Sequence, residues 1–153
     1  MNNPITHINI TENVTLITLI DVPITQNILA KIFLALAKKN INVDMISQTS
    51  PLKGIVNLSF TLSDADLFSA IGALKDFKNV IPTLRIEVNS NNTKLSLFGE
   101  SMKTTPGSAA RTMELLGDNN IDIIMITTSE VDISYLIYAS DQAKALSVLN
   151  TQE

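Results

Sequence analysis

The chain has 153 residues, of which 45% are hydrophobic and 17% charged, with a net charge of −4 and no cysteine. This composition favours one or two folded domains over a disordered chain, and it excludes disulfides, thiol catalysis and cysteine-based metal sites. Lys and Arg are scattered singly, which argues against nucleic-acid binding, and no apolar run reaches the roughly 18 residues that cross a membrane.

The elements predicted for the first half of the chain alternate strands and helices. The opening segment, MNNPITHINI, has no basic region followed by an apolar one, so no signal peptide is predicted and a cytoplasmic location is expected. Apolar and β-branched runs predict strands, and apolar residues at helical spacing predict helices. In order, these are a strand at 5–10, a polar turn at 11–13, a strand at 14–22, a helix at 28–39, a strand at 41–48, a hairpin tip at 51–54, a strand at 55–62, a helix that Ser63 and Asp64 cap and that runs to about residue 77, and a strand at 84–88.

The second half follows NSNNT at 89–93, which is the best candidate for a linker. Its predicted elements are a strand at 94–98, a loop at 99–105, a helix at 106–118, and strands at 121–127 and 132–138 before a helix at 141–150. The apolar side of the helix at 106–118 is expected to comprise Ala109, Ala110, Met113, Leu115 and Leu116.

The two halves are copies of one unit. Residues 24–48 superpose on 104–128, as Asn27 does on Gly107 at an offset of 80, and the following helices superpose at an offset of 75, as Asp66 does on Asp141. Each copy has the order β-α-β-β-α, and only the first has a final strand. We therefore predict an α+β protein of two ferredoxin-like βαββαβ domains, with antiparallel sheets and the helices on one face. The strand at 5–10 is expected to complete the second sheet, which gives a first domain at 13–91 and a discontinuous second domain at 1–12 plus 92–153.

The residues offer no catalytic machinery. His7 is the only histidine and lies in a predicted strand, where a structural or surface role is expected. There is no phosphate-binding GxxxxGK[S/T] motif, and the acidic residues are dispersed. We therefore expect no catalytic residue, no metal and no cofactor.

Two polar segments are candidates for ligand binding. KTTPG at 103–107 ends at a predicted helix N-terminus, where free N–H groups and the helix dipole favour an anion such as the α-carboxylate of an amino acid. A structural interpretation makes Thr105 the N-cap and Pro106 the first helical residue, and both interpretations can hold together. TTSE at 127–130 follows an apolar strand and is either an ordinary hairpin turn or a ligand-contacting loop.

Residues 94–137, KLSLFGESMKTTPGSAARTMELLGDNNIDIIMITTSEVDISYLI, resemble the second ACT domain in the regulatory region of aspartate kinases. The family pattern is approximately KVSIVGxGMxxxPGVAARxFxALAxxxINIxMISTSEIxISVLI. The matching residues are Gly99, Met102, Pro106, Gly107, Ala109, Ala110, Arg111, Leu116, Ile121, Met125, Ile126, Ser129, Glu130, Ile133, Ser134, Leu136 and Ile137. The first copy resembles the first ACT domain through Ala30, Phe33, Ala35, Leu36, Ala37, the run at 41–46 and Gln48.

The resemblance implies an allosteric domain that binds lysine or threonine and controls aspartate phosphorylation by feedback. It also implies tandem ACT domains that form a homodimer and act with an aspartate kinase catalytic chain, since the family's kinase lobe is not in this sequence. The chain would not be catalytic by itself, and would be an excised domain, a separate small subunit or a stand-alone relative. Carried over by position, the effector site comprises Met102, Thr104, Thr105, Gly107, Ser108, Ala109, Asp122, Ile123, Ser129 and Glu130. The matching positions in the first copy are Ile24, Gln26, Asn27, Ile28, Asn42, Val43, Asp44 and Gln48.

The roles that the resemblance suggests follow from charge. N–H groups at 107–109 would hold the α-carboxylate, carbonyl groups at 122–124 with Ser129 would hold the ammonium, and Glu130 would face a cationic or hydroxyl side chain. In the first copy the family's Asp-Lys-Pro-Gly is replaced by ITQN at 24–27, which loses the carboxylate and the glycine. We therefore expect this site to bind weakly or not at all.

Three other functions are possible on the same fold. RNA binding requires exposed aromatic residues and a basic surface, whereas this chain is acidic and 5% aromatic. Metal carriage would require thiols. A structural dimerisation module with degenerate effector sites is the strongest alternative, because the departures at 24–27 point that way.

Overall fold

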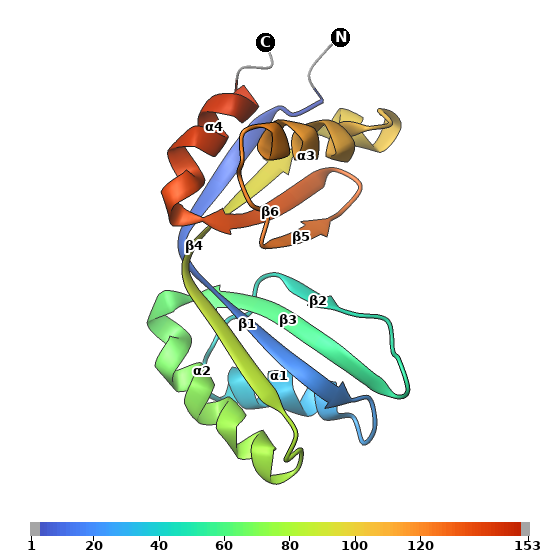
Figure 1. The fold of residues 1–153 in the computed structure, drawn as a ribbon, viewed down its shortest axis with the longest axis vertical. Helices are drawn as coiled ribbons and strands as arrows, with labels where there is room; N and C mark the ends of the chain where they lie inside the picture. The colour runs from blue at the N-terminus through green and yellow to red at the C-terminus, as the bar shows by residue number, and fades with distance from the viewer. Residues whose placement is uncertain (1–3, 151–153) are drawn as a thin grey trace. The chain divides into compact units, whose positions relative to one another are not determined.

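The computed structural model describes residues 4–150 and divides the chain into two compact units (Figure 1). Residues 13–90 form one of them, here called the central unit. Residues 4–12 and 91–150 form the other, here called the split unit. Strands β1 (His7–Pro23) and β4 (Arg85–Phe98) contribute to both units, because each contains one of the two boundaries.

In the central unit, the strand order is β2-β3-β1-β4. Its other elements are α1 (Ile28–Lys38), β2 (Ile46–Gln48), β3 (Ile55–Ser63), the 3-10 turn η1 (Asp64–Asp66), α2 (Leu67–Leu74) and the 3-10 turn η2 (Lys75–Asn79). Strand β3 pairs antiparallel with both β1 and β2. The predicted Ser63 cap is present, since the Ser63 side chain accepts a hydrogen bond from the Ala65 N–H at 3.3 Å.

In the split unit, the strand order is β1-β4-β6-β5. Its other elements are the 3-10 turn η3 (Glu100–Thr104), α3 (Ser108–Asp118), β5 (Met125–Thr128), β6 (Asp132–Tyr138), the 3-10 turn η4 (Ala139–Asp141) and α4 (Gln142–Asn150). Strand β6 pairs antiparallel with β4 and β5. The predicted α+β class, with ferredoxin-like units and antiparallel sheets, is therefore confirmed.

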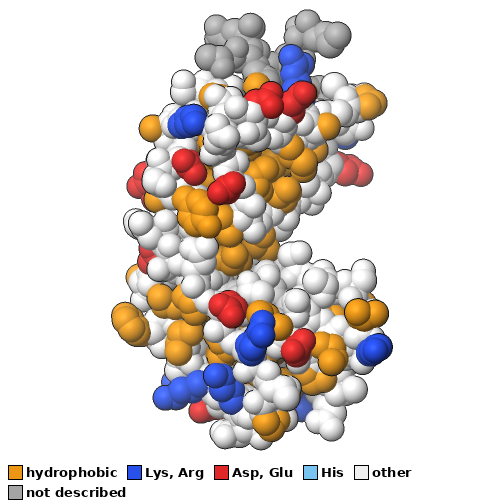
Figure 2. Space-filling view, viewed as in Figure 1, with side chains coloured by type: hydrophobic (Ala, Val, Ile, Leu, Met, Phe, Trp, Pro, Cys, Tyr) orange, Lys and Arg blue, Asp and Glu red, His pale blue; other side chains and the backbone are white. Residues whose placement is uncertain are grey.

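Each unit has its own hydrophobic core between its sheet and its helices. The central core contains Ile17, Leu19, Ile32, Leu36, Leu58, Phe60 and Leu74. The core of the split unit contains Leu95, Leu97, Leu116, Ile133, Tyr135, Ile137 and Ala145. Acidic, basic and apolar side chains are interspersed over the face of the molecule in Figure 2.

A similar buried hydrogen bond occurs in each unit. Buried Thr15 donates to Asp64 Oδ1 at 2.6 Å in the central unit, and buried Thr93 donates to Gln142 Oε1 at 2.8 Å in the split unit. In each case a strand hydroxyl is bonded to the 3-10 turn or helix that follows the β-hairpin. Because each buried hydroxyl has a partner, its desolvation is compensated. Each unit thus uses one buried threonine to hold a strand against the element that follows its hairpin.

The residues just before β1 and at its start pack within the split unit. The Thr6 N–H donates to the carbonyl of Phe98 at 2.7 Å, and the side chains of Ile5 and Ile8 contact the core of the split unit. A Cβ added at Gly99 would lie 1.7 Å from the carbonyl oxygen of Pro4, so glycine is needed here for close approach of two backbone segments.

The turn predicted at 11–13 is wrong, because this segment lies within the continuous strand β1. The linker predicted at 89–93 contains a boundary between the two units, but it is part of strand β4 and not a loop. Each segment contains one asparagine with left-handed backbone: Asn13, with φ 55°, and Asn91, with φ 60°. Asparagine tolerates this conformation in loops and within irregular strands alike. The strands predicted at 41–48 and 121–127 are shorter than expected, since β2 begins at Ile46 and β5 at Met125.

The predicted apolar side of the helix at 106–118 is partly wrong. Helix α3 begins at Ser108, and its buried residues are Ser108, Thr112 and Leu116, whereas Ala110 is exposed. Two hydroxyl side chains thus occupy positions that face the core at intervals of four residues.

Candidate functional site

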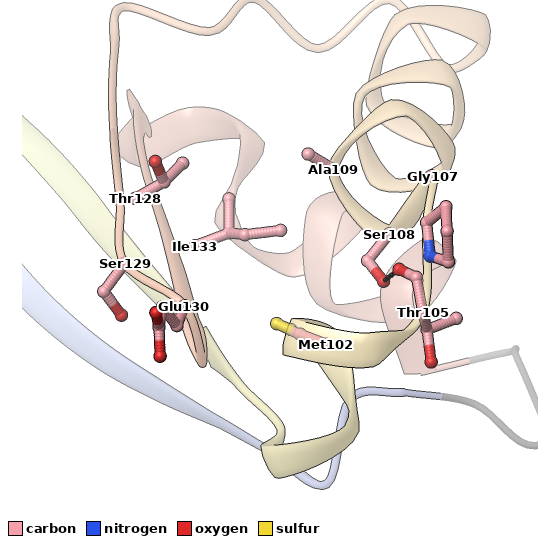
Figure 3. Close-up of a pocket in the computed structure, with 10 residues that line it drawn as sticks. Met102, Thr105, Gly107, Ser108, Ala109, Thr128, Ser129, Glu130 and Ile133 are labelled. Carbon is pink, nitrogen blue, oxygen red and sulfur yellow. Dashed lines mark hydrogen bonds between the residues drawn. The ribbon is translucent and has the colours of Figure 1, made fainter.

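A hollow of about 320 Å³ lies in the split unit between the start of α3 and the turn that joins β5 to β6 (Figure 3). The lining residues are Met102, Thr105, Pro106, Gly107, Ser108, Ala109, Thr128, Ser129, Glu130 and Ile133. In Figure 3 the residues at the start of α3 lie on one side, Thr128–Glu130 lie on the other, and Met102 lies below. The hollow has room for a small molecule.

The α3 wall begins with a left-handed turn at Gly107, which has φ 87° and ψ 1° and is the N-cap residue without a side-chain cap. The interpretation of Thr105 as N-cap and Pro106 as first helical residue is therefore wrong. The Ser108 hydroxyl donates to the Thr105 carbonyl at 2.9 Å, which fixes the loop against the helix (Figure 3). Because the first N–H groups of an α-helix lack intrahelical partners, this wall favours an anionic group.

The opposite wall is a hairpin turn closed by the Ser129 N–H, which donates to the Asp132 carbonyl at 2.8 Å. The Ser129 hydroxyl also accepts from the Val131 N–H at 3.3 Å. Glu130 is the one residue among the ten lining residues whose side chain carries a charge. The segment at 127–130 is thus a hairpin turn, and Thr128–Glu130 also line the hollow, so the two interpretations of this segment are compatible.

Apolar side chains complete the hollow. Met102, Ala109 and Ile133 line it and also contact the core of the split unit. Behind them, the hydroxyl groups of Thr112 and Tyr135 lie 2.5 Å apart. Burial raises the pKa of Tyr135 above its ordinary value of 10.0, and the hydrogen bond with Thr112 opposes part of that shift.

Seven of the ten residues expected in the effector site line this hollow: Met102, Thr105, Gly107, Ser108, Ala109, Ser129 and Glu130. The other three do not. The Thr104 hydroxyl donates to the Ser101 carbonyl, Asp122 is exposed, and Ile123 packs against the core. Pro106, Thr128 and Ile133 were not expected. Pro106 and Thr128 are neighbours of predicted residues, and the alternating pattern of the strand at 132–138 indicated the orientation of Ile133 but not a ligand role.

The corresponding positions of the central unit are arranged differently. Gln26 and Asn27 are both left-handed, with φ 57° and 54°, and the Ile28 N–H donates to the Thr25 carbonyl at 3.2 Å. The Ile28 side chain is buried in the core, Gln48 ends the exposed strand β2, and Ile24, Asn42, Val43 and Asp44 lie in the loops around α1. A hollow of about 350 Å³ in this unit lies elsewhere, and it is lined by Leu16, Thr18, Glu87, Val88 and Asn89.

Within residues 4–150, no three side chains from His, Cys, Asp and Glu come together in a way that could hold a metal ion. In the same range, no helix is both long and apolar enough to cross a membrane.

Known proteins that resemble this chain belong to the ACT-domain and aspartokinase families. A family model of the ACT domain matches residues 22–76 and again residues 95–152. An aspartokinase of Bacillus sp. (strain MGA3) is 33% identical over 139 residues, which are 91% of this chain and 34% of that protein. The chain thus spans about a third of the length of the curated relatives it matches.

Two solved structures superpose on nearly the whole of this chain. The regulatory subunit of aspartate kinase from Thermus flavus is 30% identical, with a TM-score of 0.86 over 96% of this chain and 97% of that one. A structure of aspartokinase alpha and beta subunits contains a chain that is 31% identical, with a TM-score of 0.86 over 95% and 96% of the two chains.

Proposed function

This chain belongs to the ACT-domain family, as a tandem regulatory region of the aspartate kinase type, and from that premise we propose that it senses a free amino acid in the hollow at the start of α3. Binding of the amino acid would regulate aspartate phosphorylation, the reaction of the catalytic partner. The regulatory assignment follows from the family, and the effector and its site are the proposal.

The observation that carries the proposal is the placement of opposite electrostatic groups on the two walls. The α3 wall offers N–H groups at the positive end of a helix dipole, and the opposite wall offers the Glu130 carboxylate and the Ser129 hydroxyl. A free amino acid carries a carboxylate and an ammonium group on one carbon. Such a zwitterion complements both walls at once, with the carboxylate at Gly107–Ala109 and the ammonium at Ser129 and Glu130.

Lysine or threonine is the proposed effector. The apolar surface of Met102, Ala109 and Ile133 suits the aliphatic part of either side chain, and Glu130 suits a terminal ammonium or hydroxyl. A structure of E. coli aspartokinase III, which shares the fold at 23% identity and a TM-score of 0.75, is a complex with lysine and aspartate.

A thermal-shift screen against the twenty amino acids tests the proposal. A ligand that binds only the folded state raises the melting temperature, so lysine or threonine should give a shift that the other amino acids do not. Glu130→Gln removes the charge at nearly constant size and should reduce that shift. Asp122→Asn is the matched control, because Asp122 is exposed and does not line the hollow, and it should leave the shift unchanged.

The partners proposed for the chain follow from the relatives. We propose that it acts in the cytoplasm with an aspartate kinase catalytic chain and forms a homodimer through its ACT units. Co-purification with that chain and size-exclusion chromatography with light scattering test the two associations separately.

A structural dimerisation module with degenerate sites is the second candidate, and the central unit favours it. Two consecutive non-glycine residues adopt left-handed backbone at the start of α1, and the Ile28 N–H is already bonded to Thr25. We propose that the central site binds amino acids weakly or not at all. Tight binding that Asp44→Ala abolishes would contradict this, and a dimer that shows no shift with any amino acid would favour the structural module.

A further inference from the structure

A buried polar pair lies behind the proposed effector site, and an apolar pair takes its place in the central unit. Thr112 on α3 and Tyr135 on β6 are 2% and 0% exposed, and their oxygens lie 2.5 Å apart. The equivalent residues, 80 and 75 positions earlier, are Ile32 and Phe60, which are fully buried in the central core. At this helix–strand contact the split unit therefore has a hydrogen bond, which depends on direction, whereas the central unit has apolar packing, which does not.

The hydrogen bonds of this pair reach the backbone of α3. The Thr112 hydroxyl lies 3.0 Å from the Ala109 carbonyl and 3.3 Å from the Ser108 carbonyl. Either hydroxyl can donate to the other, and the Tyr135 hydroxyl also lies 3.4 Å from the Ala109 carbonyl, which only accepts. Strand β6 is thereby connected to the first turn of α3 through two buried side chains.

The residues at both ends of this connection line the hollow. Ser108 and Ala109, whose carbonyls accept from Thr112, form the α3 wall, and Ile133, two residues before Tyr135 on β6, lines the hollow as well. An apolar contact tolerates small shifts of one element along another, whereas a buried hydrogen bond requires a narrow range of distance and angle. The pair therefore fixes the first turn of α3 relative to β6.

We propose that Thr112 and Tyr135 are positioning residues for the amino-acid effector. They hold the N–H groups at the start of α3 at the distance from Glu130 that lets a single zwitterion engage both. Neither residue lines the hollow, so they act through Ser108, Ala109 and the strand. This inference rests on the proposed function of the same hollow.

Replacing the pair with its central-unit counterpart tests the inference. The double substitution Thr112→Ile with Tyr135→Phe installs a pair that already packs between a helix and a strand of this chain. We expect it to fold and to bind lysine or threonine roughly five- to tenfold more weakly by calorimetry, because one or two directional contacts are lost. Tyr135→Phe alone is the milder variant and should weaken binding roughly threefold, since Thr112 keeps its bond to the backbone.

A control separates positioning from loss of stability. Leu149→Ala removes a buried side chain of α4 that neither lines the hollow nor belongs to the pair, so it should lower the melting temperature and leave the affinity unchanged. Unchanged affinity in the folded double variant would overturn the inference, as would an equal loss of affinity in Leu149→Ala.

Amide exchange without ligand gives a second readout that does not depend on the proposed function. The Arg111 N–H donates to the Gly107 carbonyl at 2.9 Å in the first turn of α3. In the double variant it should exchange at least about threefold faster relative to the amide of Leu116, later in the same helix. If the wild type binds no amino acid, the proposed function fails, and this ratio alone decides the positioning role: an unchanged ratio refutes it and a raised ratio supports it.

Discussion

Substitutions at Gly107 test whether glycine is required at the start of α3 by the left-handed backbone conformation or by a lack of room for a side chain. Its φ of 87° is left-handed, and a Cβ added there would meet no atom within 4 Å. Gly107→Ala should therefore cost only the backbone penalty of about 1–2 kcal/mol for a left-handed L-residue, reduced by about 0.4–1 kcal/mol because the unfolded chain becomes less flexible. The net loss of roughly 1 kcal/mol corresponds to a fall in melting temperature of about 2–4 °C for a chain of this size.

The repeat supplies a graded variant and an opposite control. Asn27 holds the equivalent position of α1 with φ 54°, so Gly107→Asn should cost less than Gly107→Ala. Gly117→Ala lies within α3, where a Cβ also has free space, and should stabilise the protein by up to about 1 kcal/mol. Thermal unfolding checks all three. A Gly107→Ala variant as stable as the wild type, or a Gly107→Asn variant less stable than Gly107→Ala, would refute the reasoning.

Three further predictions concern the strands and their ends. Gly99→Ala should displace the segment around Pro4, because the new Cβ would lie 1.7 Å from its carbonyl oxygen, and amide exchange at Thr6 should accelerate. Deletion of the first ten residues should loosen the split unit, whose core Ile5 and Ile8 contact, and exchange that increased only within residues 17–88 would contradict this. Above about pH 10 the unfolded chain loses the Tyr135 proton while the folded chain keeps it, so stability should fall as pH rises. Urea unfolding between about pH 9 and pH 11 should show a smaller fall for Tyr135→Phe.

Much of the fold was predicted from the repeat, because two copies of one pattern can be compared with each other, which adds information to local propensity. The bounds of β6 and the cap at Ser63 follow from alternation and hydroxyl chemistry, which are local properties. The wrong turn at 11–13 and the strand found at 89–93 in place of a loop have one cause. Runs of Asn and Thr indicate a loop only when no partner strand is available, and here β1 and β4 are neighbours in the sheet.

The sequence predicted only those residues of the candidate site that carry local signals. The glycine turn and the TTSE segment carry local signals, so the sequence suggested Gly107, Ser129 and Glu130. Ile133 lines the hollow only because β6 is central in the sheet, which is a long-range property. The buried Thr112–Tyr135 contact was not predicted, because apolar periodicity assigns polar residues to the exposed side of a helix.

The central unit also limits what the turn at the start of α3 can show about ligand binding. Its equivalent turn keeps a left-handed N-cap at Asn27, without a side-chain cap, although the family's glycine and acidic residue are absent. The turn therefore serves the fold in both units, and its geometry alone is weak evidence for a ligand. What distinguishes the split unit is the combination of that turn with Glu130, the hydroxyl groups of Ser108 and Ser129, and a polar contact that joins α3 to β6. The proposed effector site depends on this combination, so Glu130→Gln and the Thr112/Tyr135 double variant probe it more directly than any change at the turn.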